Sequence, residues 1–175
     1  MFEIRAATQA DAASVAAIHV RGWKTTYRGI LPDGLLDALR VEDRLPQWLG
    51  WIEGPRVHTL VACRGAEPIG FVRLCPARPI ADPPPEYAEI THLYVDRQAH
   101  GGGVGRALIG RALQIARTEG YRGVLLWVLE ENHRARAFYE AAGLRADGTS
   151  RTEPAFLGND AAEVRYALAF APEPA

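Results

Sequence analysis

Four glycines lie within five residues in the stretch HGGGVGR, which spans residues 100–106. The apolar run EITHLYV ends just upstream, and the run VGRALIGRALQIARTEG, with apolar residues at helical spacing, begins inside the stretch. A glycine-rich loop between a strand and a helix lets backbone N–H groups converge on an anion, which the helix N-terminus also attracts. The stretch therefore predicts a phosphate-binding loop, and a strand-to-helix turn without a ligand is the alternative.

Spacing excludes the two most familiar phosphate-binding patterns at this loop. The dinucleotide pattern GxGxxG fails because Arg106 and Leu108 occupy the possible positions of its last glycine. The P-loop pattern fails because Gly110 is followed by Arg111 and Ala112, where lysine and a hydroxyl side chain are required. The loop must therefore serve a different phosphate ligand if it serves one.

The rest of the chain alternates between strand and helix patterns. A first strand at 2–8 leads into a helix whose inner face holds Val15, Ile18, His19 and Gly22. Short helices interrupted at Pro46 then precede a hairpin. The remaining strand patterns cover 86–95, 122–130 and 162–170, and the remaining helix patterns cover 104–120 and 132–143. Strands flanked by helices predict a single α/β domain with a mixed sheet covered on both faces.

Composition narrows the choice of partners and location. The net charge of -1 gives no general attraction to polyanions, so neither nucleic acid nor a membrane is expected as a partner. The N-terminus lacks the pattern of a signal peptide, which predicts a cytoplasmic protein. Cys63 and Cys75 are not spaced as metal ligands, so we expect free thiols and no metal.

The segment LYVDRQAHGGGVGRALI resembles the acetyl-CoA loop of the GCN5-related N-acetyltransferase (GNAT) superfamily. In that family arginine or glutamine is followed by two residues, a glycine, one residue, and a glycine or alanine. His100, Gly103 and Gly105 occupy those three positions here. Histidine at the first position departs from the pattern, whereas a backbone cradle does not depend on that side chain.

A second segment, ENHRARAFYEAAGL, resembles the downstream element of the same family. There an asparagine precedes a helix that ends in Phe-Tyr, and Asn132, Phe138, Tyr139 and Gly143 match that element. Taken alone, Asn132 and Gly143 are also good helix caps, and Tyr139 suits the core as well as catalysis. Both segments in order, with one strand between them, make the resemblance much more specific.

The resemblance covers nearly the whole chain and implies a mostly antiparallel, twisted sheet with helices on both faces. Residues 1–85 would carry the acceptor wall, 86–144 the acetyl-CoA core and 145–171 the C-terminal strands. The implied acetyl-CoA contacts are Leu93, Tyr94, Val95, His100, Gly101, Gly102, Gly103, Val104, Gly105, Arg106, Asn132 and Tyr139. The Tyr139 hydroxyl would lie beside the sulfur, where a phenol can act as general acid toward the departing thiolate.

Three residues are candidates for the base that accepts a proton from the amine. Glu89 lies inside an apolar strand, where a carboxylate is costly unless it is paired or faces a wet cleft, so it is either a catalytic base or a salt-bridge partner. His92 competes with it, but strand alternation predicts that His92 faces away from Glu89 and packs in the core or an interface. His19, among alanines and valines, is expected to be structural.

The resemblance implies an acetyl-CoA-dependent N-acetyltransferase that acts on a primary amine of a small molecule or peptide. Trp23 and Tyr27 are candidates for the wall of the acceptor pocket, although aromatic residues on a helix also suit the core. A non-catalytic acyl-CoA-binding sensor is the alternative function. A homodimer is an alternative to a monomer, and the sequence does not decide between them.

Overall fold

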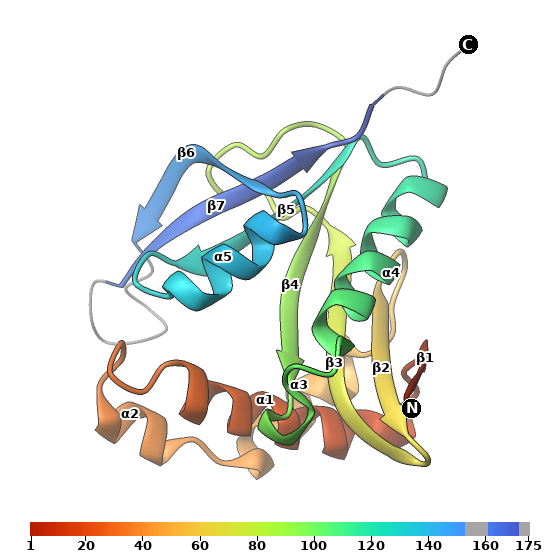
Figure 1. Cartoon of the computed structure of the whole chain (residues 1–175), viewed down its shortest axis with the longest axis vertical. Helices are drawn as coiled ribbons and strands as arrows, with labels where there is room; N and C mark the ends of the chain where they lie inside the picture. The colour runs from red at the N-terminus through yellow and green to blue at the C-terminus, as the bar shows by residue number, and fades with distance from the viewer. Residues whose placement is uncertain (153–160, 172–175) are drawn as a thin grey trace.

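A seven-stranded sheet with the order β1-β2-β3-β4-β5-β7-β6 runs through the molecule (Figure 1). The computed structural model describes residues 1–152 and 161–171. Its strands are β1 Glu3–Ala6, β2 His58–Arg64, β3 Glu67–Pro76, β4 Tyr87–Val95, β5 Gly123–Leu129, β6 Arg145–Thr152 and β7 Ala162–Ala169. All neighbouring pairs are antiparallel except β4 and β5, which confirms the predicted mixed, mostly antiparallel sheet.

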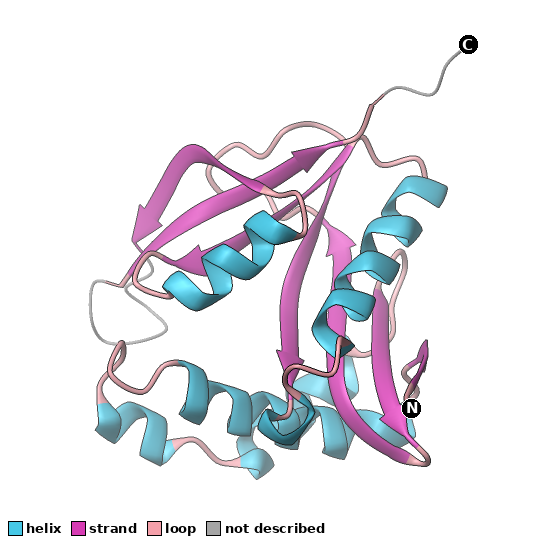
Figure 2. Cartoon of the chain, viewed as in Figure 1, coloured by secondary structure: helices cyan, strands magenta, loops and turns pink. Residues whose placement is uncertain are grey.

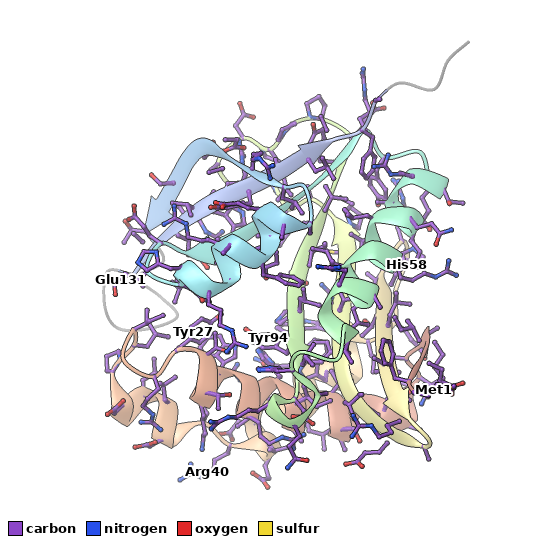
Figure 3. All side chains as sticks on the ribbon, in the orientation of Figure 1. Met1, Tyr27, Arg40, His58, Tyr94 and Glu131 are labelled. Atoms are coloured by element: carbon purple, nitrogen blue, oxygen red, sulfur yellow. The ribbon has the colours of Figure 1, made fainter. Side chains whose placement is uncertain are left out.

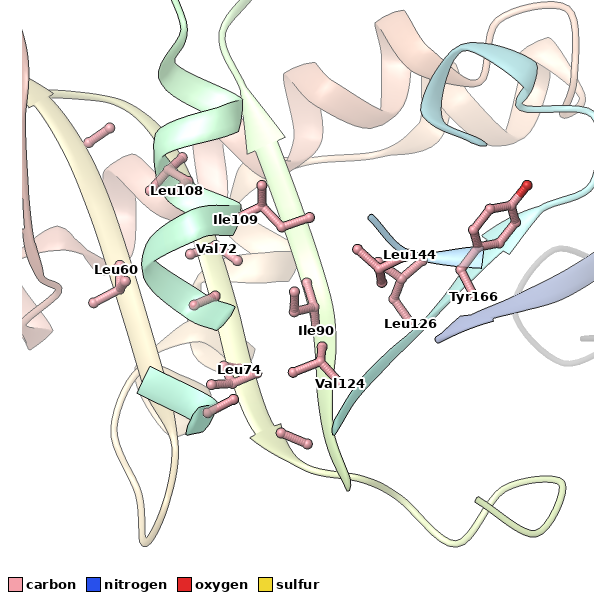
Figure 4. Close-up of a cluster of buried hydrophobic side chains, with 14 of the residues drawn as sticks. Leu60, Val72, Leu74, Ile90, Leu108, Ile109, Val124, Leu126, Leu144 and Tyr166 are labelled. Carbon is pink, nitrogen blue, oxygen red and sulfur yellow. The ribbon is translucent and has the colours of Figure 1, made fainter. Parts of the chain in front are cut away.

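Helices cover both faces of the sheet, as predicted (Figure 2). They are α1 Ala12–Thr26, α2 Asp33–Ala38, α3 Val41–Trp51, α4 Val104–Thr118 and α5 His133–Ala141. Alternation along the strands separates two cores: Leu60 and Val72 pack with α4, while Val61 and Phe71 pack with α1 and α3. Figure 4 shows the first core, which extends under α4 from β2 to Tyr166 of β7.

The helix that contains Pro46 corrects one expectation. The sequence predicts an interruption at this proline, but α3 continues through it. The break lies earlier, at Leu39 and Arg40, whose extended backbones separate α2 from α3. Proline removes only one helical hydrogen bond, and the burial of Trp48 in the next half-turn offsets that loss.

The parallel strands β4 and β5 separate soon after they meet. They pair only over Tyr87–Glu89 and Gly123–Leu125, after which both strands continue without further pairing to each other (Figure 4). The meeting point is tight, because a Cβ on Gly123 would lie 2.3 Å from the Tyr87 ring. Beyond Glu89, the edge of β4 that faces β5 is therefore open, and its backbone groups can bond to something other than a strand.

A β-bulge in β4 corrects the predicted orientation of His92. His92 pairs with Arg73 and Ile90 pairs with Leu74, which leaves Thr91 without a residue opposite it. Ile90 and Leu93 consequently share the face that packs on α4, although three positions separate them. His92 therefore lies on the same face as Glu89, not on the opposite one.

His19 of α1 lies in an aromatic cluster with the His92 ring, whose centroid is 4.9 Å from its own. The Trp48 indole N–H donates to Nδ1 of His19 at 3.1 Å, so Nε2 carries the hydrogen of the neutral ring. That Nε2 is buried and has no hydrogen-bond partner among the described residues. Burial lowers the pKa of His19 to about 3, so the ring is uncharged at neutral pH, and its position in the buried aromatic cluster is that expected of a structural histidine.

Mild acid should destabilise the fold through His19. Unfolded histidine has a pKa of about 6.5, so below that pH the unfolded chain binds a proton that the folded His19, with its pKa of about 3, excludes. The stabilising contribution is complete above about pH 6.5 and declines below it, by up to about 1.4 kcal/mol per pH unit. His19→Asn cannot titrate and retains an acceptor for Trp48. Between about pH 7 and about pH 5, its free energy of unfolding in urea should fall less than that of the wild type, and equal losses would contradict this explanation.

Candidate active site

The glycine loop between β4 and α4 has two residues in the left-handed region. Gly101 and Gly103 have φ values of 78° and 79°, which side chains rarely adopt, and a Cβ at either would meet no heavy atom within 4 Å. Gly103 is the N-cap of α4, so the amides of the loop and of the first helical turn lie together. Gly105 has a different constraint, because a Cβ there would lie 3.4 Å from the Phe138 ring.

His100 connects the end of β4 to the first turn of α5. Its Nδ1 lies 3.1 Å from Nη2 of Arg134, which can only donate, so Nδ1 accepts. The hydrogen of the neutral ring is then on Nε2, which donates to the Val95 carbonyl at 2.9 Å. Histidine at this motif position thus joins the glycine loop to α5. Sequence reasoning missed Arg134, and nothing in the pattern of the helix singles it out.

Asn132 and Phe138 place α5 against the loop. Asn132 is buried, and its Oδ1 accepts from the Ala135 amide at 3.2 Å, as the N-cap pattern predicts. The Phe138 ring packs into the first core and against Gly105. The cofactor contact predicted for Asn132 remains a prediction beside this capping role.

Three tyrosines from different elements gather where β4 and β5 diverge. The hydroxyl of Tyr27, at the end of α1, lies 3.2 Å from that of Tyr94 on β4. Figure 3 shows both residues in the region between α5 and the α1–α2 segment. Burial raises the pKa of each of these phenols, and also that of Tyr139 on α5. The Tyr139 ring packs against Phe138, while the Trp23 ring lies 5.2 Å from that of Tyr27.

Glu89 is almost fully buried, and its carboxylate is occupied by Arg78. The Nε of Arg78 lies 3.1 Å and 3.0 Å from the two carboxylate oxygens, Nη2 bonds to Oε1, and the Arg78 amide donates to Oε2 at 3.1 Å. This is the salt-bridge alternative considered for Glu89. Arg78 lies in the proline-rich loop after β3, and the sequence carries no signal that pairs the two residues.

Comparisons with known proteins agree with this architecture. The model of the acetyltransferase (GNAT) family matches residues 23–144. The protein named "Probable N-acetyltransferase Rv2775" of Mycobacterium tuberculosis is 34% identical over 173 residues, which cover 94% of this chain and 92% of that protein. The PaiA N-acetyltransferase of Thermoplasma acidophilum, solved in complex with coenzyme A, superposes with a TM-score of 0.76 at 20% identity, covering 94% of this chain and 98% of that one. The chain therefore belongs to the GNAT family, a family of acetyl-CoA-dependent acyltransferases.

Two further properties concern only the residues that the structure describes. No helix within 1–152 or 161–171 is both long and apolar enough to cross a membrane. In the same ranges, no group of three or more histidine, cysteine, aspartate or glutamate side chains is arranged to hold a metal ion. Cys63 and Cys75 are free, as predicted, and both are buried.

The pair between Glu89 and Arg78 predicts that Glu89→Gln will act mainly on stability. Loss of the buried charge should lower the free energy of unfolding by about 1 to 2 kcal/mol, less than for a fully buried pair because Arg78 is half-exposed. Arg78→Gln should have a similar effect, and the double variant should lose less than the sum. A large fall in kcat for Glu89→Gln, at unchanged stability, would instead identify Glu89 as the base.

Proposed function

We propose that this protein transfers the acetyl group of acetyl-CoA to a primary amine of a small molecule or peptide. The observation that carries the proposal is the open edge of β4 beyond Glu89, which leads directly to the glycine loop at the N-terminus of α4. An extended thioester substrate could bond along this edge and end with its phosphates on the loop amides. Family membership gives independent support.

On the donor side, the chain offers mainly backbone groups. The amides of Leu93, Tyr94 and Val95 belong to the unpaired part of β4 and are candidates to polarise the thioester carbonyl. The pyrophosphate cradle would be the amides of Gly101, Gly102, Gly103, Val104, Gly105 and Arg106. An Nη2 donor of Arg134, held by His100, lies beside this cradle.

Tyr139 is the proposed general acid. Burial raises the pKa of its phenol, so the hydroxyl remains protonated at neutral pH. Among the described residues, this hydroxyl has no hydrogen-bond partner that would compete with a substrate atom. The same dry surroundings disfavour the departing thiolate, which a hydrogen bond from Tyr139 would stabilise.

The proposal also names residues for the catalytic base and for the wall of the acceptor pocket. Glu89 as a water-mediated base stays a prediction, and its pair with Arg78 would have to open for that role. Trp23 and Tyr27 are the proposed acceptor wall, because both pack against an apolar cluster that contains Leu129 of β5. The cytoplasmic location, the oligomeric state and the lack of a nucleic-acid or membrane partner also stay predictions.

The first test is acceptor-dependent release of CoA with the wild type and Tyr139→Phe. The wild type should release CoA with at least one member of a panel of small amines, amino acids and peptides. Tyr139→Phe should lower kcat by at least about 100-fold, the lower end of the usual contribution of a general acid, with the acetyl-CoA affinity within about twofold. Saturable acetyl-CoA binding without release across the panel would favour the sensor alternative, and an unchanged kcat would remove Tyr139 from the mechanism.

The cradle assignment is tested by Gly103→Val. A β-branched residue at a φ of 79° is strained and would displace the loop amides, so calorimetry should detect little or no acetyl-CoA binding. Gly110→Ala is the matched control, since it lies within α4 where a Cβ meets nothing within 4 Å. Its binding and thermal stability should equal those of the wild type. Normal binding by a folded Gly103→Val protein would contradict the cradle.

A further inference from the structure

A glycine in the middle of α1 makes room for the Tyr94 ring. A Cβ on Gly22 would lie 2.5 Å from Cδ1 of Tyr94, which real contacts essentially never reach, and 3.1 Å from Cγ, which is tighter than most real contacts. Glycine inside a helix is less stable than alanine, and the φ of Gly22 is not one that requires glycine. The residue therefore serves the close approach of α1 to β4. Because Gly22 has no side chain, the Tyr94 ring can pack directly against the backbone of α1.

The packed ring carries the Tyr94 hydroxyl to that of Tyr27, at the end of the same helix. The two oxygens are 3.2 Å apart, so one hydroxyl donates to the other. A hydroxyl has one hydrogen and two lone pairs, and the pair therefore keeps one hydrogen and several lone pairs for a third group. Burial holds both phenols in the protonated, uncharged form.

The hydroxyl pair is related both to the open edge of β4 and to Tyr139. Tyr94 belongs to the part of β4 whose edge is open toward β5. Tyr139, which comes from α5, interacts electrostatically with both Tyr27 and Tyr94. The hydroxyl proposed to protonate the thiolate thus comes from α5, whereas the two hydroxyls of the pair come from the end of α1 and from β4.

The surroundings of the pair are aromatic or apolar, and nearby charges are neutralised. Trp23 packs on Tyr27, and the cluster around them includes Leu129 of β5. Glu163 of β7 acts electrostatically on Tyr27, but its carboxylate accepts from Nε of Arg151 at 2.7 Å.

The other ionisable groups close to the pair bring no negative charge. The rings of His19 and His92 contact that of Tyr94, and burial lowers the pKa of both histidines, so they are neutral at neutral pH. The Arg44 guanidinium lies over Trp23 at 5.8 Å. The site therefore has little to stabilise an ammonium ion and suits an uncharged amine.

We propose that the Tyr27–Tyr94 hydroxyl pair binds the acceptor nitrogen as a neutral primary amine. The inference rests on the proposed acetyl transfer and assigns the acceptor half of that site. An N–H of the amine would donate to a hydroxyl oxygen, which leaves the nitrogen lone pair free to attack the thioester carbon. The N–C bond then forms and the C–S bond breaks. Water takes the surplus proton of the nitrogen, Tyr139 protonates the thiolate, and water restores the Tyr139 proton.

The test compares Tyr27→Phe and Tyr94→Phe with Tyr121→Phe. Tyr121 also has a buried hydroxyl, but that hydroxyl has no hydrogen-bond partner among the described residues and belongs to the core under α4. Loss of one neutral hydrogen bond should raise the KM for the acceptor about fivefold to tenfold. The KM for acetyl-CoA should stay within about twofold, and Tyr121→Phe should change neither constant.

A second variant tests the packing that positions the pair. Gly22→Ala should displace the Tyr94 ring and raise the KM for the acceptor as Tyr94→Phe does, while Gly110→Ala should have no effect. With acceptors of different basicity, the pH dependence of kcat/KM should follow the pKa of each free amine. One pKa common to all acceptors would point to a titrating base on the protein and would overturn binding of the neutral amine.

The outcomes separate this inference from the proposed function. A wild type without acceptor-dependent CoA release overturns both. A wild type that transfers acetyl groups, with folded Tyr27→Phe and Tyr94→Phe proteins that keep the acceptor KM, overturns only the hydroxyl pair. A rise in the KM for acetyl-CoA alone would indicate that the hydroxyl pair contacts acetyl-CoA. That result would also overturn the assignment of the pair to the acceptor amine.

Discussion

The separation of β4 from β5 is the constraint on which the rest of this structure depends. Two parallel strands that meet for three residue pairs and then diverge leave backbone donors and acceptors unpaired at the centre of the sheet. Buried backbone groups without partners are costly, so such an opening is stable only if water or a ligand satisfies them. The glycine loop, the first turn of α4, Tyr94 and Tyr139 are all arranged around this opening.

Glycines set how closely the surrounding elements can approach the opening. Gly123 lets the two strands meet beside the Tyr87 ring, Gly105 lets α4 meet Phe138 of α5, and Gly22 lets α1 meet Tyr94. In each of these contacts, an aromatic ring occupies the space that a side chain at the glycine position would fill. In the loop itself, by contrast, the backbone conformation favours glycine at Gly101 and Gly103. The glycines near the site therefore have two distinct physical roles, close packing and left-handed turns.

Local patterns predicted the elements around the glycine loop. The strand EITHLYV, the glycine loop, the helix after it and the Asn132 cap are each encoded within a few residues, because caps and glycine turns act over one or two helical turns. Errors appeared where long-range packing outweighed a local signal. The helix continued through Pro46 because Trp48 is buried against α1 and β3, and alternation failed in β4 because a bulge inserted Thr91.

The sequence by itself determined the family, the mixed α/β architecture and the glycine loop between β4 and α4, since these depend on residue order and short-range spacing. Tertiary structure alone decided the state of individual side chains. Glu89 pairs with Arg78, which lies in a loop eleven residues earlier in the sequence. Tyr27 bonds to Tyr94 of β4, a strand that follows the β2–β3 hairpin in the sequence. Whether a carboxylate is free to act as a base, or two hydroxyls can share one nitrogen, depends on such partners. Periodicity assigns a side chain to a face, whereas packing across the sheet determines what it meets there.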